Sequence, residues 1–199
     1  MEEGVADFLR EFHTEIAFLP DYYGKFLNGP GETYLVHLSE AKKEEIRAIV
    51  KLMRLGRERL RLSPQDFSLG VVASIYHDIG KIREDSEAHH SEHGRNIILN
   101  IDRRARDLAM IVGQCNRASF NEDGTLLVSR VIYAGEVVNA EMTGVVRPGN
   151  ETYDRAVKTL KEIAVHPQAI EVVRFVKDSR PEIVEFYRER RKSSGVSEK

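Results

Sequence analysis

The chain of 199 residues contains one cysteine, Cys115, and no tryptophan. A single cysteine cannot form a disulfide within the chain, so this composition favours a reducing compartment. No segment approaches the roughly 18 consecutive apolar residues that a membrane helix needs. The sequence MEEGVADFLREFHTE at the N-terminus is acidic and lacks the basic and apolar regions of a secretory signal. We therefore expect a cytoplasmic protein without a membrane partner.

An excess of charge of one sign is also absent. The chain has 30 lysine and arginine residues against 32 aspartate and glutamate residues, which gives a formal charge of -2. Binding to nucleic acid or to an anionic membrane is driven by a positive surface, so we expect neither as the main partner. A chain of this length can bury a full hydrophobic core, and no repeat or linker divides residues 1–199, which we expect to form a single domain.

Apolar residues recur at helical spacing along nearly the whole chain. Between residues 5 and 18, apolar side chains follow one another at intervals of three and four. Ser39 is a suitable N-cap for a long helix. Ser63 followed by Pro64 is a suitable start for the apolar helix that contains LGVVASIYHDIG, which Gly80 would end. Further helices are expected over residues 88–100, 103–118, 125–142, 151–165, 167–178 and 180–191.

Two passages need a separate interpretation. Residues 20–34 are rich in proline and glycine and predict a loop between helices. The stretch LLVSRVIY, residues 126–133, has the composition of a strand but is equally consistent with a buried helix that continues through AGEVVNAEM. Because every other periodic segment is helical, the sequence predicts an all-α bundle.

Residues able to bind a metal ion gather around one pattern. His77 and Asp78 are adjacent at the end of the apolar run LGVVASIYHDIGKI, and Glu136 lies in the apolar stretch VIYAGEVVNAEM. Imidazole nitrogen together with carboxylate oxygen suits divalent iron, manganese, zinc and similar ions. The segment HHSEHG supplies three further histidines, namely His89, His90 and His93.

The same residues can also have a purely structural role that needs no metal ion. Buried polar side chains are normally hydrogen-bonded, so His77 and Asp78 can also be a pair that satisfies the backbone at a helix end. Glu136 would be costly to bury as an unpaired charge, and Arg130, six residues earlier, does not lie on the same helix face. A metal ion would supply the missing partner. Lys81 suits either a helix C-terminus or a bound phosphate.

HDIGK at a helix end, followed by HHSEHG, resembles the HD superfamily of metal-dependent phosphohydrolases. The resemblance covers roughly residues 40–145 and implies an all-helical HD core, with a helical C-terminal extension over residues 150–191. It also implies that His77 and Asp78 bind metal and that Lys81 lies near the substrate phosphate.

Two branches of the superfamily match the histidine-rich segment. HSEHG is similar to the HPEIG element of the HD-GYP branch, which would make His90 the ligand of a second metal. HHSEHG is also similar to a segment of the exopolyphosphatase HD domain, in which His93 is an equally good match. The paired histidines of the HD-GYP branch correspond to Gln114 and Cys115, so a site with three metal ions is not expected.

The chain also departs from the HD pattern at the outer ligand positions. The family's first histidine lies on the preceding helix, where this chain offers Glu45 or, in a shifted register, Lys42, while His37 lies further upstream. The family's final aspartate corresponds to Glu136. Glutamate is a competent oxygen ligand. We therefore expect a divalent ion (manganese, iron, zinc, nickel or magnesium), with at most one more, bound by residues from the set Glu45, His77, Asp78, His90 and Glu136.

Two functions follow as alternatives from this resemblance. The first is hydrolysis of a phosphoester or phosphoanhydride, with a nucleotide as the expected substrate class; Asp78 orients or deprotonates water, and Lys81 stabilises charge on the phosphate. The second is a binding or signalling module that keeps the HD fold after losing catalysis. Replacement of the first histidine and the final aspartate favours the module, while the intact HDIGK favours the hydrolase. The sequence leaves open whether the chain forms a homodimer.

Overall fold

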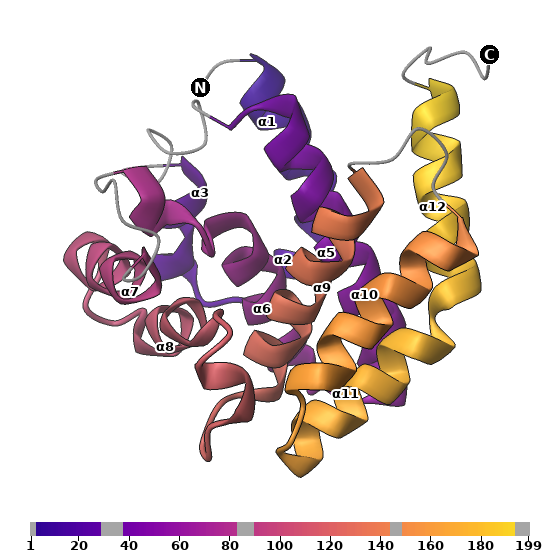
Figure 1. The fold of residues 1–199 in the computed structure, drawn as a ribbon. Coiled ribbons are helices and arrows are strands. Elements are labelled where there is room, and N and C mark those ends of the chain that lie inside the picture. The colour runs from indigo at the N-terminus through magenta and orange to yellow at the C-terminus, as the bar shows by residue number, and fades with distance from the viewer. Residues whose placement is uncertain (1–2, 29–37, 83–89, 144–148, 194–199) are drawn as a thin grey trace.

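The computed structural model describes residues 3–28, 38–82, 90–143 and 149–193. Over these ranges the chain is predominantly helical and contains no strand (Figure 1). The stretch 126–133, which could have been a strand, falls almost entirely within α9 (Leu127–Thr143). The predicted all-α bundle is therefore confirmed.

The α-helices differ in length from one turn to more than five turns. In chain order they are α1 (Glu3–Arg10), α2 (His13–Ile16), α3 (Gly24–Asn28), α5 (Glu40–Arg59), α6 (Pro64–Tyr76), α7 (His90–Ile101), α8 (Arg106–Gln114), α9, α10 (Asn150–Ile163), α11 (Pro167–Asp178) and α12 (Arg180–Ser193). Short 3-10 helices are η1 (Asp21–Tyr23), η2 (Ile79–Ile82) and η4 (Ser119–Asn121).

α5, which carries Glu45, and α6, which ends just before His77, begin where the sequence predicts. Ser39 Oγ accepts a hydrogen bond from the backbone N–H of Lys42 at the start of α5 (3.2 Å). Ser63 Oγ accepts one from the backbone N–H of Asp66 at the start of α6 (3.0 Å). Every residue of α6 from 67 to 76 is buried, as expected for an apolar helix at the centre of a bundle.

The N-terminal segment forms two helices rather than the single helix predicted over residues 5–18. α1 ends at Arg10 and α2 begins at His13. In the turn between them Glu11 accepts two hydrogen bonds from the guanidinium group of Arg47 on α5, with N–O distances of 2.7 and 2.5 Å. A long-range ion pair and the buried Phe12 thus fix a turn that local periodicity does not reveal.

The predicted loop over residues 20–34 is helical in its first part. η1 and α3 together cover residues 21–28, and the remainder of the predicted loop lies outside the described residues. Tyr23 and Phe26 are buried, and Phe26 packs edge-on against Tyr76 of α6, with the ring centroids 5.9 Å apart. Burial of these aromatic rings anchors the segment despite its glycine and proline content.

α8 ends earlier than the helix predicted over residues 103–118, because the side chain of Asn116 takes over the backbone partners at its C-terminal end. Asn116 Nδ2 donates to the carbonyl of Gly113 (3.1 Å), and Asn116 Oδ1 accepts from the backbone N–H of Ser119 (2.8 Å). Such local side-chain bonds compete with helix continuation. Residues 115–118 consequently leave the helix and form a turn.

Gly135 allows α9 to approach α5 closely. A Cβ atom at this position would lie 2.9 Å from Cγ1 and 3.3 Å from Cα of Ile49, so a larger residue would push the helices apart. The two helices pack side by side in the core, with α6 as their common neighbour (Figure 1). This contact brings Glu136, the next residue on α9, towards the face of α5 that carries Glu45.

Glycine is needed at position 80 because the backbone of η2 approaches the start of α7 closely, and not because a helix ends there. α6 already ends at Tyr76 and Gly80 lies within η2, so the predicted helix stop at Gly80 is wrong. A Cβ atom there would lie 1.8 Å from the carbonyl oxygen of His90 and 2.7 Å from the backbone nitrogen of Gly94. The missing side chain therefore lets HDIGK pack directly against the start of α7.

The C-terminal helices pack on the helices that carry the expected ligands. α10 and α11 contact α9, and α12 contacts α5 (Figure 1). The hydroxyl of Tyr187 on α12 donates to Asn139 Oδ1 on α9 (2.9 Å), and both groups are buried. Buried apolar residues from Phe8 to Tyr187 belong to one continuous core. None of the helices in the described ranges has the length and apolar character needed to cross a membrane.

Candidate metal centre

His77 follows the last residue of α6, and its side chain is completely buried. Nδ1 lies 2.7 Å from the carbonyl oxygen of Ser74. A carbonyl can only accept a hydrogen bond, so Nδ1 carries the proton in this contact. In the neutral ring the lone pair of Nε2 is then free for another partner, which is the arrangement that metal-binding histidines usually adopt.

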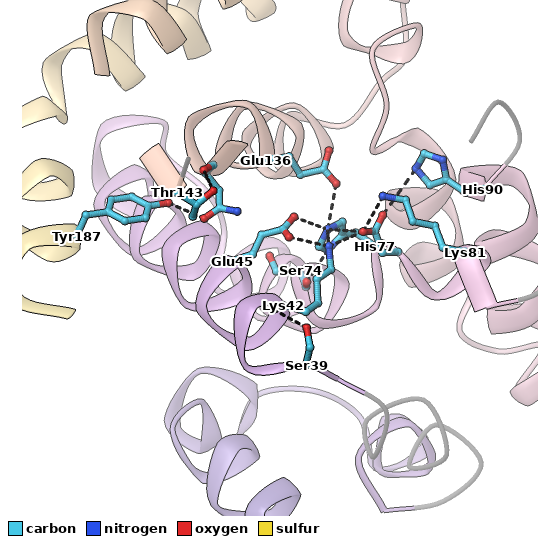
Figure 2. A network of polar contacts seen from close by, with 12 residues as sticks. Ser39, Lys42, Glu45, Ser74, His77, Lys81, His90, Glu136, Thr143 and Tyr187 are labelled. Carbon is cyan, nitrogen blue, oxygen red and sulfur yellow. Dashed lines mark hydrogen bonds and ion pairs between the residues drawn. The ribbon is translucent and has the colours of Figure 1, made fainter. Parts of the chain in front are cut away.

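Nε2 of His77 faces charged groups from two other helices (Figure 2). Lys42 Nζ and Glu136 Oε1 each lie 3.0 Å away, and Glu45 Oε1 lies 3.4 Å away. Burial and the nearby lysine lower the pKa of His77, but the two carboxylates outweigh them and raise it to about 9. The imidazole is therefore held in a cluster whose carboxylates favour a cation at Nε2.

The two oxygens of Asp78 have different surroundings. Oδ2 contacts the ammonium group of Lys42 and that of Lys81, the latter at 2.9 Å. Oδ1 is buried and has no hydrogen-bond partner in the described part of the chain; His90 Nε2 lies 3.8 Å from it. Although burial raises the pKa of Asp78, the charges of His77 and the two lysines lower it well below its usual range. Asp78 is thus a charged carboxylate with one oxygen left without a donor.

Lys42 and Glu45 lie on the same face of α5, one turn apart. Glu45 Oε2 is 2.9 Å from Lys42 Nζ, and both side chains are mostly buried. Burial raises the pKa of Glu45, but hydrogen bonding to His77 and the charge of Lys42 lower it overall. Sequence matching offers Glu45 and Lys42 as alternative occupants of the first ligand position. The helix presents both of them to His77.

Three of the expected ligands form a group that could hold a metal ion. One ligand atom each from Glu45, His77 and Asp78 lies within 4.8 Å of the other two. The unpaired Asp78 Oδ1 and the carbonyl-bound Nδ1 of His77 both fit such a role, because they leave an oxygen and a nitrogen lone pair for a cation. Mixed nitrogen and oxygen ligands suit borderline divalent ions. We call Glu45, His77 and Asp78 the donor group.

The other two expected ligands lie at the edges of the donor group. Glu136 contacts it through His77, on the side of α9. His90, the first residue of α7, lies on the side of the site away from Glu45 (Figure 2), with its Nε2 3.8 Å from Asp78 Oδ1. Asp78 therefore lies between His77 and His90, each 3.8 Å from one of its oxygens, which is the arrangement expected if a second ion were bound.

A cleft of about 850 Å³ opens over the donor group. The acidic residues Glu45, Asp78 and Glu136 line it together with Lys42 and Lys81. Opposite these, the turn that follows α8 contributes Asn116 and the exposed Arg117, and α9 contributes Tyr133 and Asn139. Arg117 forms no ion pair or hydrogen bond with any residue that the structure describes, so its guanidinium group is available to a ligand.

Several residues considered at the sequence level have other roles. His93 does not line the cleft. Gln114 Oε1 accepts a hydrogen bond from the backbone N–H of Leu126 (2.9 Å). The thiol of Cys115 is buried and donates to the carbonyl of Ile111 (3.1 Å), and burial raises its pKa well above the usual value. His37 and His89 lie outside the described residues.

Sequence reasoning missed the groups that support the donor group. Ser74, which fixes His77, lies in an apolar helix and acts through its backbone, so no side-chain pattern could identify it. Asn116 lines the cleft from the turn that follows the end of α8, and Tyr133 lines it from α9. The proximity of Lys42 to the expected ligands could have been inferred from its spacing of three residues from Glu45.

Comparison with models of protein families, with curated proteins and with solved structures gave no significant match. Membership of the HD superfamily therefore stays a prediction that depends on HDIGK and HHSEHG.

Proposed function

We propose that the chain is a metal-dependent phosphohydrolase that cleaves a phosphoester or phosphoanhydride bond of a nucleotide. The observation that carries the proposal is the position of a buried histidine–carboxylate donor group on the floor of a cleft that also contains unshared positive charge. Ligand pockets in proteins commonly measure about 300–1,000 Å³, and this cleft of about 850 Å³ falls within that range.

The chemistry of the donor group narrows the choice of ion. Manganese, iron, zinc and nickel accept nitrogen and oxygen ligands together, whereas magnesium prefers oxygen and water, so the first four fit better. Glu45, His77 and Asp78 would hold the ion, with Glu136 next to His77. A bound divalent ion supplies an acidified water molecule and polarises a phosphoryl oxygen.

The remaining polar groups of the site would bind and orient the substrate. Asp78 would orient the attacking water through the carboxylate oxygen that does not hold the ion. Lys81 has a half-exposed side chain whose ammonium group lies at the edge of the cleft, 2.9 Å from Asp78 Oδ2. An ammonium group has no lone pair for a metal but stabilises charge that develops on a phosphoryl group.

The far wall of the cleft favours a nucleotide over a bare phosphate ester. Arg117 supplies a second cation for a phosphate chain. Tyr133 is only partly buried, packs against Phe120 with the ring centroids 5.2 Å apart, and offers an aromatic surface on which a base could stack. Asn116 adds hydrogen-bonding capacity, although its amide already serves the turn.

The test is hydrolysis by the purified chain after reconstitution with each of the five metals in turn. The substrates are nucleotides, cyclic dinucleotides, guanosine tetraphosphate, polyphosphate and an aryl phosphate, assayed by release of phosphate or nucleoside. We expect turnover with at least one metal, loss of turnover in His77→Ala, and unchanged turnover in His13→Ala, which alters an exposed histidine that does not line the cleft.

One observation favours the binding or signalling module as a second candidate. The ammonium group of Lys42 already contacts all three members of the donor group. A site whose positive charge is supplied by the chain itself could bind a phosphorylated ligand without hydrolysing it. Binding of a nucleotide by the metal-loaded chain, with no turnover of any substrate in the panel, would favour this module over the hydrolase.

A further inference from the structure

Lys42 occupies the position within the donor group that a metal ion would need. Its Nζ lies 3.0 Å from His77 Nε2 and 2.9 Å from Glu45 Oε2, and it also contacts Asp78 Oδ2. An ammonium group has three N–H donors, and here an oxygen of Glu45, an oxygen of Asp78 and, when the imidazole is neutral, Nε2 of His77 lie within reach as acceptors. The side chain is 17% exposed, so this contact is largely withdrawn from water.

These contacts cannot persist when the same atoms bind a divalent ion. A metal ion bound by these residues would need the lone pair of His77 Nε2 and an oxygen of Glu45, and the ammonium group now contacts both residues there. Two cations within contact distance of one buried group also repel each other strongly, since little water screens them. One of the two must leave, and only Lys42 is attached through a flexible four-carbon chain that borders an open cleft.

We infer that Lys42 is an internal competitor of the metal ion: it neutralises the donor group when no metal is bound and swings into the cleft when a metal enters. This inference rests on the metal centre of the proposed function. It implies that the chain has a lower affinity for metal than its ligands alone would give, because only the fraction of molecules with Lys42 displaced can bind the ion. It also delivers a second ammonium group to the cleft, beside Lys81, only when metal is present.

Removing the ammonium group of Lys42 tests the competition directly. Lys42→Leu deletes the charge without adding a donor atom, and Lys43→Leu is the matched control, because the neighbouring Lys43 pairs with Glu40 (2.7 Å) instead of the donor group. Cobalt(II) and manganese(II) binding are measured by calorimetry, with the visible spectrum of cobalt(II) as a second readout. We expect Lys42→Leu to bind about 5- to 150-fold more tightly than wild type, and Lys43→Leu to match wild type.

A measurement on the wild-type chain covers the case in which Lys42→Leu fails to fold. Lysines are acetylated with a mild reagent, with and without manganese(II), and each modified position is quantified by mass spectrometry. We expect acetylation of Lys42 to increase when metal is added, because its side chain moves into the cleft, while acetylation of Lys43 stays constant.

The outcomes separate this inference from the proposed function. Equal metal affinity in wild type and Lys42→Leu, or acetylation of Lys42 that does not respond to metal, would overturn the competition and leave the metal centre intact. Absence of metal binding in both proteins would overturn the metal centre and the competition together. Tighter binding in Lys42→Leu supports the inference even if no substrate is turned over.

Discussion

The backbone carbonyl of Ser74 determines which ring nitrogen of His77 faces the other residues of the site. Because Nδ1 donates to this carbonyl at 2.7 Å, the ring cannot rotate without leaving a buried acceptor unsatisfied. Nε2 is therefore directed at Glu45, Glu136 and Lys42 whether or not a ligand is present. The last turn of α6, which ends just before His77, therefore fixes the orientation of the imidazole ring.

Lys81→Ala should separate phosphate binding from metal binding. The ammonium group cannot ligate a metal, so the variant should keep its metal content, while turnover falls roughly 10²–10³-fold because charge on the phosphoryl group is no longer stabilised. Metal content is measured by elemental analysis and turnover on the best substrate of the panel. Lys43→Ala, which removes a lysine that pairs outside the cleft, serves as control. Unchanged turnover in Lys81→Ala would remove this role from the lysine.

The sequence could identify the residues that come together in the donor group but not the role of Lys42 beside them. HDIGK identifies His77 and Asp78, and an acidic residue in an apolar helix identifies Glu136. On α5, sequence matching poses Glu45 and Lys42 as alternatives, yet residues three apart share a helix face and both reach the site. Whether Lys42 neutralises its neighbours depends on distances between α5 and the end of α6, and these follow from packing that no linear pattern records.

At the scale of the elements, the contact between η2 and α7 sets the geometry at the edge of the site. Gly80 of η2 lies so close to the first turn of α7 that its missing side chain is a condition of the contact. The same contact keeps the side chains of Asp78 and His90 close together, with 3.8 Å between Asp78 Oδ1 and His90 Nε2. The position of α7 therefore decides whether His90 and Asp78 can bind the same ion.

Gly80→Ala should destabilise the fold and weaken the site together. The new methyl group would overlap the carbonyl oxygen of His90, and overpacking of this kind typically costs about 1–3 kcal/mol of the free energy of unfolding. Gly24→Ala is the control, because a Cβ atom there meets nothing within 4 Å and the backbone is already helical. Urea denaturation measures both variants. Equal stability of Gly80→Ala and wild type would show that η2 and α7 are not in firm contact.

Helix starts were easier to predict than helix ends. Ser39 and Ser63 indicate the starts of α5 and α6, because an N-cap side chain bonds to the backbone of the first turn that follows it. The end of α8 depends on Asn116, whose amide bonds both to the helix behind it and to the turn ahead. Asparagine is common within predicted helices as well, so its choice of partners could not be inferred from the sequence.

For the whole molecule, the C-terminal helices support the wall of the cleft from behind. Tyr187 on α12 donates a buried hydrogen bond to Asn139, a residue of the cleft wall on α9. On the same helix, Arg190 pairs with Glu44 of α5 at 2.9 Å, next to Glu45 of the donor group. α5 and α9, which face each other across the site, are thus both bonded to α12. Binding in the cleft and stability of the fold should therefore be linked.

Metal binding should raise the stability of the entire fold, because the residues that would hold the ion come from α5 and from the end of α6, and His77 contacts Glu136 of α9. An ion that binds only the folded chain, at about 100 times its dissociation constant, adds about 2.7 kcal/mol to the free energy of unfolding. For a chain of this size that corresponds to an increase in Tm of roughly 5–10 °C. Thermal unfolding with and without manganese(II) measures the effect.

The variants decide whether this stabilisation comes from the donor group. His77→Ala and Asp78→Ala should lose both the bound metal and the increase in Tm, since each removes a ligand atom, whereas His13→Ala should keep them. The increase should also grow with the logarithm of the metal concentration above the dissociation constant, as linkage requires. An equal increase in His77→Ala and wild type would place the ion elsewhere on the chain, and the cleft would then need a different source for its chemistry.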